Sequence, residues 1–227
     1  MKKNKIVAVV LSAAFLLLPS CNMSNTAKGG MIGAGSGAGV GALIGGLIGQ
    51  GKGAAIGAGI GAVVGTGAGV LIGKKMDKAA EQAKEIEGAK VEQGEQNGVQ
   101  YVKVTLDSGI TFPTNGTTLS ATAKNELSKF VMQLDPQFDL AIAGHTDNTG
   151  TLEVNQRISL QRAQSVANHL NSCGVQYSRL RSVKGYDYQY PIADNSTAAG
   201  RAQNRRVELY LLPSQAMINE ANAAAGK

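Results

Sequence analysis

The stretch "FDLAIAGHTDNTGTLEVNQRISLQRAQSVANHL", residues 138–170, contains a strand, a turn and a helix in direct succession. Its apolar start is typical of a buried strand. From about Leu152 apolar residues recur at helical spacing, and Gly174 suits a left-handed residue that ends the helix. His145 and Asp147 follow the strand directly. This turn therefore has the residues for either a catalytic pair or a binding site.

The pattern of strands and helices extends over residues 99–213. "VQYVKVTL" alternates apolar and polar residues, which predicts a half-buried strand. "LRSVKGY" predicts another strand, and "RRVELYLL" predicts one with Val207, Leu209 and Leu211 on one face. Ser120 is the expected N-cap of a further helix. The predicted order is β-α-β-α-β-β. We expect an α+β domain with two helices on one face of a small mixed sheet, because β-α-β units cross over with a right hand.

The N-terminus has the pattern of an export signal over residues 1–20, with a basic "MKKNK" and an apolar run too short to span a membrane. "LLPSC" resembles the bacterial lipobox, which implies a lipid on Cys21 and a tether over residues 21–28. Asn22 is not the Asp that retains such lipoproteins at the inner membrane, so we expect the outer membrane. The alternative is an ordinary secretory signal followed by an unrelated cysteine.

A glycine recurs at every fourth position from Gly29 to Gly73, and Lys52 is the only charged residue between them. Such a face lets helices approach closely in a bilayer, where backbone groups must be satisfied internally. We expect a glycine-zipper helical hairpin with arms at residues 31–49 and 54–72, inserted in the membrane or packed on it. The alternative is a soluble Gly/Ala linker, flexible or self-associating. A homo-oligomer therefore stays an open possibility.

The other segments are more polar. Residues 74–98 are rich in Glu, Lys and Ala and predict an exposed, partly helical spacer, and residues 214–227 form a C-terminal tail. The formal charge of +6 falls to +3 when residues 1–20 leave with their three lysines, and 4% of the residues are aromatic. These values argue against a nucleic-acid partner.

Three motifs of the 99–213 domain carry a resemblance: "GHTDNTG", the helix "NQRISLQRAQSV" and "NRRVEL". Together they are similar to the OmpA C-terminal domain family, and with the lipobox and glycine repeat they look most like its outer-membrane lipoproteins. The resemblance implies noncovalent binding of the peptidoglycan stem peptide, through the end of diaminopimelate that carries an ammonium and a carboxylate. It implies that Asp147 accepts from the ammonium and that Arg162 donates to the carboxylate.

The resemblance also suggests supporting residues around that pair. Asn155 matches a helix asparagine that borders the pocket, and Arg205 matches the first arginine of the "NRRVE" motif. The neighbouring Arg206 is the candidate for a structural role. The opposite wall and the apolar floor are assigned to Phe112, Thr114, Leu160 and Ala163.

Catalysis is the competing interpretation of His145 and Asp147. No nucleophile or metal set accompanies them in the sequence, and the chain's other histidine, His169, lies far along the helix. A flagellar-stator-like role would need a carboxylate in the apolar stretch, and residues 31–72 contain none. A peptidoglycan hydrolase would need paired carboxylates or zinc ligands. We therefore expect a binding protein, not an enzyme, without metal or cofactor, in the periplasm on a lipid anchor. The remaining alternative is a glycine-zipper self-assembling protein that wall binding merely localises.

Overall fold

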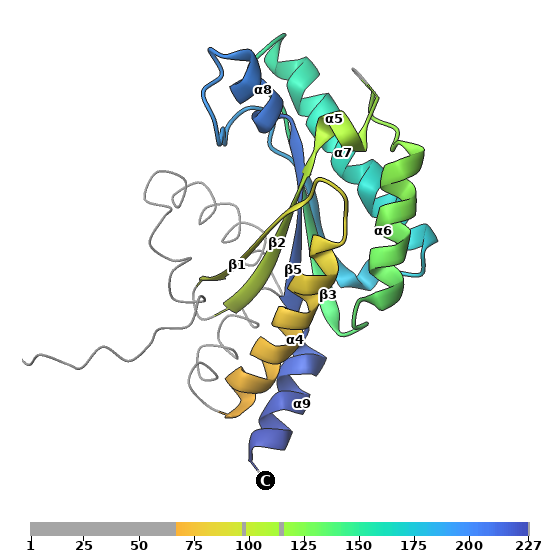
Figure 1. Cartoon of the computed structure of the whole chain (residues 1–227), viewed down its shortest axis with the longest axis vertical. Helices are drawn as coiled ribbons and strands as arrows, with labels where there is room; N and C mark the ends of the chain where they lie inside the picture. The colour runs from red at the N-terminus through yellow and green to blue at the C-terminus, as the bar shows by residue number, and fades with distance from the viewer. Residues whose placement is uncertain (1–66, 97–98, 114–115, 227) are drawn as a thin grey trace, which may run out of the picture.

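A computed structural model describes residues 67–96, 99–113 and 116–226 of the chain (Figure 1). The elements in chain order are α4 (Gly67–Lys84), β1 (Lys90–Gln96), β2 (Val99–Asp107), α5 (Ser108–Thr111), α6 (Ala121–Gln133), β3 (Phe138–His145), α7 (Leu152–Ser172), η2 (Tyr177–Arg179), β4 (Leu180–Gly185), α8 (Ala198–Asn204), β5 (Arg206–Pro213) and α9 (Gln215–Ala225). The predicted α+β class is confirmed, because β2, α6, β3, α7, β4 and β5 occur in the expected order.

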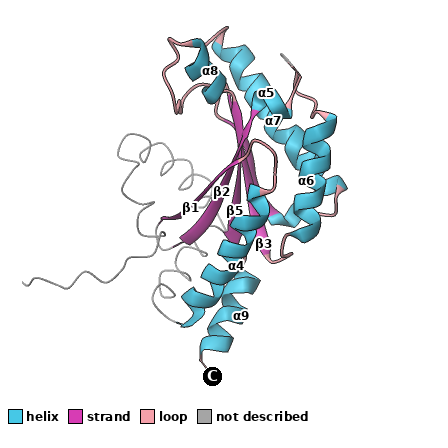
Figure 2. Ribbon diagram, viewed as in Figure 1, coloured by secondary structure: helices cyan, strands magenta, loops and turns pink. Residues whose placement is uncertain are grey.

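The five strands form one mixed sheet in the order β1-β2-β5-β3-β4. β3 and β4 are parallel, and the pairs β1–β2, β2–β5 and β3–β5 are antiparallel. The parallel pair is joined through α7, which packs on both of its strands. α6 and α7 lie side by side along one side of the sheet (Figure 2). The sheet therefore holds the C-terminal end of β3 beside the first turns of α7.

The core lies between this sheet and the helices. β5 contributes Val207, Leu209 and Leu211, which alternate along the strand and are fully buried. α7 contributes a stripe at helical spacing that consists of Ala163, Val166, Ala167 and Leu170. Burial of these aliphatic groups stabilises the fold by about 25 cal/mol per Å² of apolar surface removed from water.

Local signals set the helix boundaries as the sequence predicts. The Ser120 side chain accepts a hydrogen bond from the backbone N–H of Ala123 and begins α6. Thr151 does the same for Val154 at the start of α7. Gly174 has a φ of +99° just after α7, a conformation that L residues with a side chain rarely adopt.

Two glycines allow α7 to lie unusually close to the sheet. A Cβ atom at Gly144 of β3 would overlap the backbone carbonyl of Ser159, and one at Gly185 of β4 would overlap the backbone of Leu160. The middle of α7 thus rests directly on the two parallel strands. This contact sets the height of the helix above the end of β3.

The structure differs from the sequence expectation in the segments on either side of residues 99–213. The predicted exposed spacer, residues 74–98, contains most of α4, which packs on β1 and β2, and all of β1, which pairs with β2 along its whole length. The predicted tail contains α9, which packs against α4. The folded domain is therefore larger than 99–213, because α4 and α9 bury apolar stripes that include Ile72, Met76, Met217 and Ile218.

Much of the N-terminal prediction lies outside the described residues. These are the signal of residues 1–20, Cys21 with its tether, and the glycine-rich segment up to residue 66. The last residues of the predicted second hairpin arm are described, and Ala68 and Ile72 are buried in the core of the domain. Among the described helices, none combines the length and the apolar character that a membrane crossing requires.

Candidate binding site

Asp147 lies in the loop that joins β3 to α7. Its Oδ1 accepts hydrogen bonds from the backbone N–H and the hydroxyl of Thr149, an Asx-type turn. Gly150 then takes a φ of +83°, and Thr151 caps α7. The turn reverses the chain within a few residues. The two hydrogen bonds from Thr149 fix the orientation of the Asp147 carboxylate in this loop.

The carboxylate of Asp147 is kept ionised by its neighbours. Only 4% of the residue is exposed, and burial works to raise its pKa. The hydrogen bonds from Thr149 and Arg205 outweigh burial, so the pKa of Asp147 lies below its ordinary value. The ion pair is short, because Nη1 of Arg205 lies 2.6 Å from Oδ2 of Asp147. A buried carboxylate of this kind favours a cationic partner.

Arg162 projects from α7 and is also nearly buried, with 5% of its surface exposed. Its Nε donates to the carbonyl of Gly116 at 3.1 Å, and its guanidinium carbon lies 5.2 Å from the centre of the Phe112 ring. Burial and then the charge of Arg205 lower the pKa of Arg162, while the charge of Asp147 raises it. Phe112 and Gly116 thus fix the plane of the guanidinium through a cation–π contact and one hydrogen bond.

The structure brings Asp147, Arg162 and Arg205 within electrostatic range of one another. Within the described residues no ion pair joins Asp147 to Arg162, because Arg205 occupies the Asp147 carboxylate. The Arg205 side chain is 42% exposed, so it is free to move toward solvent. The arrangement offers one acceptor and two guanidinium donors. Such a set fits a zwitterion with an ammonium and a carboxylate on one carbon.

The other residues predicted for the site differ in their surroundings. Asn155 is buried and its amide donates to the carbonyl of Thr149, so it holds the Asp147 turn. Phe112 is buried under Arg162. Ala163 is fully buried in the core, whereas Leu160 is 38% exposed, and their assignment to an apolar floor of the site stays a prediction. Thr114 lies outside the described residues.

The two arginines of the "NRRVE" motif have separate roles. Arg205 faces Asp147, whereas Arg206 is 2% exposed and donates through Nε to Glu208 at 2.8 Å. Tyr210 donates to the other oxygen of Glu208. Burial acts to raise the pKa of Glu208, but the nearby His145 ring, the charge of Arg206 and the hydrogen bond from Tyr210 lower it well below its ordinary range. This buried network supports the sheet beneath the site.

His145 belongs to that network and not to a catalytic pair with Asp147. Its Nε2 lies 3.5 Å from Glu208, and its ring stacks on Tyr186 at a centroid distance of 5.8 Å. The side chain is fully buried, and this burial lowers its pKa. His145 therefore packs inside the domain at the end of β3.

Sequence reasoning missed several groups that hold the site. Thr149 orients Asp147, and its position two residues after an Asp is a recognisable Asx-turn signal. The backbone carbonyl of Gly116 orients Arg162, and a contact to a backbone carbonyl cannot be predicted from a side-chain pattern. The Asp187 N–H bonds the Ser159 hydroxyl and its carbonyl accepts from Thr146. Asp187 has a φ of +42°, and this strained residue ties the loop after β4 to both α7 and the Asp147 loop.

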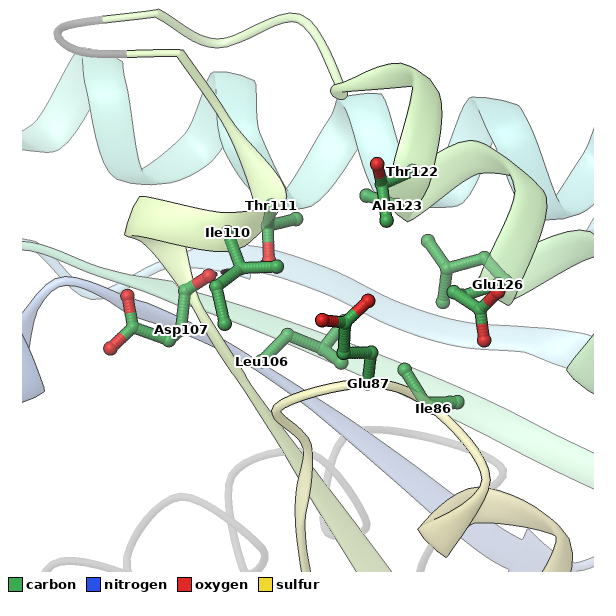
Figure 3. A pocket seen from close by; sticks show the side chains of 10 residues that line it. Ile86, Glu87, Leu106, Asp107, Ile110, Thr111, Thr122, Ala123 and Glu126 are labelled. Carbon is green, nitrogen blue, oxygen red and sulfur yellow. Dashed lines mark hydrogen bonds between the residues drawn. The ribbon is translucent and has the colours of Figure 1, made fainter.

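A separate small hollow opens between the turn after α4, α5 and the start of α6 (Figure 3). Its lining includes the apolar side chains of Leu106 and Leu127 and the acidic residues Glu87, Asp107 and Glu126. Asp107 already caps α5, and Glu126 pairs with Lys129. None of the residues assigned to the zwitterion site lines this hollow.

Among the described residues, no group of three or more His, Cys, Asp or Glu side chains is placed to hold a metal ion. The polar groups around Asp147 are cationic or neutral donors. Their chemistry suits an organic ion and not a metal.

Comparison with known proteins adds relatives for both parts of the chain. The chain is 43% identical over 110 residues to "Probable lipoprotein YiaD" of Escherichia coli, a match that covers 48% of this chain and 50% of that protein. It is 45% identical over 74 residues to "Peptidoglycan-binding protein ArfA" of Mycobacterium bovis, covering 33% and 22% of the two chains. The chain thus spans about half the length, or less, of these relatives.

Solved structures share the fold. A structure described as the cell wall anchor of the T6SS from Pseudomonas aeruginosa superimposes with a TM-score of 0.52 at 24% identity, over 61% of this chain and 97% of that one. Residues 1–77 match the model of the YMGG-like Gly-zipper family, and residues 111–205, which include Asp147, Arg162 and Arg205, match that of the OmpA family. The chain is therefore similar to the OmpA family over residues 111–205 and, before that segment, to the YMGG-like Gly-zipper family.

Proposed function

We propose that this chain is a noncovalent peptidoglycan-binding lipoprotein that tethers the outer membrane to the cell wall. The observation that carries the proposal is the pair of buried, oppositely charged groups at the end of β3, Asp147 and Arg162, each oriented by its own hydrogen bonds. Relatives named as a lipoprotein, as outer-membrane proteins and as a peptidoglycan-binding protein support it. The role is binding and not catalysis.

The ligand of the site is the free end of a diaminopimelate side chain in the stem peptide. Its ammonium takes the place that Arg205 holds at Asp147, and its carboxylate receives the guanidinium of Arg162. Arg205 is partly exposed and swings from Asp147 toward the ligand carboxylate as the ammonium arrives. The exchange replaces one charge pair by two, so the cost of opening the internal pair is offset at the same site.

The rest of the chain supplies the attachment to the membrane. Residues 1–20 direct export, Cys21 carries the lipid after processing, and residues 21–28 are the tether. The glycine-rich residues 29–66 associate with the membrane, in line with the match to a glycine-zipper family. The OmpA-family domain then lies in the periplasm, where the wall is within its reach.

Co-sedimentation of the full chain with purified sacculi tests the proposal. We compare the native chain with Asp147→Asn and Arg162→Gln, which remove charge while they keep much of the shape. Asp77→Asn on α4 is a charge-matched control on an exposed residue. Loss of a hydrogen bond to a charged group costs about 1.5–3 kcal/mol, so each site variant should bind at least about tenfold more weakly. A native chain that stays in the supernatant, or site variants that pellet equally, would overturn the proposal.

Self-assembly through the glycine zipper is the second candidate, because residues 1–77 match a glycine-zipper family. In this case wall binding only localises the protein. Cross-linking the mature chain with and without residues 29–66 distinguishes the two. An oligomer that disappears with the deletion supports assembly, and an unchanged monomer argues against it.

A further inference from the structure

Two apolar side chains near the Gly67 end of α4 lie exposed to solvent. Val70 is 59% exposed and Leu71 is 38% exposed, whereas the next residue, Ile72, is buried against the domain. Single exposed apolar residues are common on protein surfaces, but two adjacent ones at the end of a helix form a small continuous patch. The proposed wall-binding site does not use this patch.

Positive charge follows the apolar patch along the same side of the helix. Lys74 and Lys78 lie four and eight residues after Val70, so the three side chains project in nearly the same direction. Both lysines are exposed. The first acidic residue of α4 is Asp77, and its carboxylate accepts a hydrogen bond from Gln93 of β1. Apolar residues followed by lysines are typical of a helix at a membrane surface, where the ammonium groups contact lipid phosphates.

The C-terminal end of α9 lies beside this patch. A Cβ atom at Gly67 would be 3.2 Å from the Cβ of Ala225, so the two helix ends pack closely. The last turn of α9 adds the exposed residues 223–225, which are all alanines. We call these exposed groups the α4–α9 tip, which consists of Val70, Leu71, Lys74, Lys78 and residues 223–225. The tip thus combines small apolar groups with positive charge.

The α4–α9 tip and the Asp147 site lie at opposite ends of the molecule. α9 follows the Pro213 end of β5, and Pro213 pairs with Phe138 at the start of β3. The other end of the same strand pair joins Arg206 to His145, next to the Asp147 loop. The length of β5 alone separates these ends by about 23 Å. Figure 1 shows α9 and the start of α4 at one end of the molecule and α8 at the other. When the tip faces a membrane, the site faces away from it.

We propose that the α4–α9 tip rests on the surface of the membrane that holds the N-terminal part of the chain, in contact with anionic lipid headgroups. The proposal rests on the membrane attachment in the proposed function. Residues 1–77 match a glycine-zipper family, and the chain before residue 67 leads into the domain at this tip, so attachment brings the tip close to the lipid. Each lysine near an anionic surface strengthens such a contact by about fivefold.

A protein partner fits the α4–α9 tip less well than a lipid surface. Stable protein–protein interfaces use about 20–30 residues on each side, and the tip has far fewer. Its lysines would also repel those of a second copy placed against the same surface. At a membrane a weak contact is enough, because the attached chain keeps the tip at high effective concentration near the lipid.

Fluorescent labelling of the full lipoprotein in vesicles tests this proposal. The background carries Cys173→Ser, and Val70→Cys then supplies the thiol for an environment-sensitive dye, since the lipid occupies Cys21. Leu152→Cys is the matched control, because Leu152 is 47% exposed at the start of α7, near the Asp147 loop. The vesicles contain phosphatidylethanolamine and phosphatidylglycerol, with brominated lipids as quenchers. We expect a blue-shifted emission that brominated lipids quench at position 70, and neither effect at position 152.

The contribution of charge is measured in the same assay. Lys74→Gln should reduce the quenching at position 70, and so should replacement of phosphatidylglycerol by phosphatidylcholine. Lys124→Gln removes an exposed charge from α6 and should leave the quenching unchanged.

Flotation of the vesicles separates this proposal from the proposed function. Protein that floats with an unquenched label at position 70 overturns the contact of the tip and leaves the membrane attachment intact. A blue shift without quenching overturns it as well, since another part of the chain or a second copy then covers the tip. Equal quenching at positions 70 and 152 would show that the domain has no preferred orientation. Protein that does not float contradicts both the attachment and the contact.

Discussion

The geometry of Arg162 explains why an arginine and not another cation occupies this position. Its Nε is engaged by the carbonyl of Gly116 and its plane rests near Phe112, so the terminal nitrogens are left as a fixed fork. A lysine would retain the charge without the fork or the stacked plane. The site thus depends on shape as much as on charge.

Arg162→Lys should weaken binding to sacculi by about tenfold or more, because a bidentate contact becomes a single flexible one. Half-maximal binding in the co-sedimentation assay measures the effect. Arg179→Lys is the matched control, since Arg179 is also partly buried and donates through Nε to a backbone carbonyl, that of Phe138. Native affinity of Arg162→Lys would show that binding requires only the positive charge and not the geometry of the guanidinium.

The pH dependence of stability should report His145. Burial lowers its pKa in the folded state below the unfolded value of about 6.5, so the unfolded chain binds the extra proton first as pH falls. The stability linked to neutral His145 is complete above about pH 6.5 and decreases as pH falls below it. Asp147 and Glu208 have lowered pKa values, so their contribution is lost only at more acidic pH.

We therefore expect the free energy of unfolding in urea to decrease between pH 7.5 and pH 5, and the decrease to be smaller in His145→Gln. His169→Gln, which leaves His145 in place, serves as the control and should retain the native slope. An unchanged slope in His145→Gln would show that another group titrates in this window.

At the scale of elements, α7 connects packing with function. Gly144 and Gly185 let it rest on β3 and β4, and the same helix carries Arg162 toward Asp147. A side chain at either glycine must push α7 away from the sheet. The distance between the two charged groups then changes with the packing.

Gly144→Ala should destabilise the domain by about 1–3 kcal/mol through overpacking and should also weaken sacculus binding, because α7 shifts with Arg162. Gly150→Ala is the control for Gly144→Ala, because it adds the same methyl group without a steric clash. No atom lies within 4 Å of its added Cβ, and its cost is about 1 kcal/mol from the positive φ alone. Chemical denaturation and co-sedimentation measure the two effects. Equal losses for the two variants would argue against the close helix–sheet contact as the cause.

The elements differ in how far the sequence predicts them. Strong alternation in β2 and β5, the Ser120 cap and the position of Gly174 predict local structure that the fold retains. α4 and α9 were not expected to pack on the domain, because a Glu-, Lys- and Ala-rich helix can be stable when exposed. The buried stripe of α4, with Ile72 and Met76, crosses the predicted boundary at residue 73. The predicted boundary at the end of the glycine repeat assigns the two halves of this buried stripe to different segments, so the stripe is not recognised in the sequence.

The candidate site shows the same limit. The resemblance to the OmpA C-terminal domain family predicts that Asp147 and Arg162 lie near one another, and their order along the turn and α7 after β3 is compatible with that. It does not predict that Arg205 holds Asp147 in the free protein, because that contact depends on how the chain returns from α8 to β5. Long-range contacts of this kind follow from the sheet order, which strand patterns alone do not determine.

In the proposed function, the whole molecule combines a membrane attachment with a wall-binding domain on one chain. Many such chains between the same two surfaces act together, since each bound domain keeps its neighbours at high effective concentration. A modest affinity at each Asp147 site is then enough for a stable link. The strength of the link also depends on how the N-terminal part holds the membrane, by the lipid on Cys21 or by the glycine-rich hairpin.

The structure argues against a second hairpin arm that reaches residue 72 and crosses the membrane. Ala68 and Ile72 are buried in the domain, so they are not available to a second hairpin arm that ends at residue 72. The remaining residues 54–66 would form a helix of about 20 Å, shorter than the roughly 30 Å of hydrocarbon. We therefore predict that residues 22–227, exported behind an ordinary secretory leader and lacking Cys21, are released from membranes by alkaline carbonate, while the native protein is retained. Cys173→Ser in the native chain controls for the loss of a thiol and should be retained. Retention of the chain without Cys21 would show instead that the glycine-rich segment crosses the bilayer and that the start of α4 leaves the domain to let it do so.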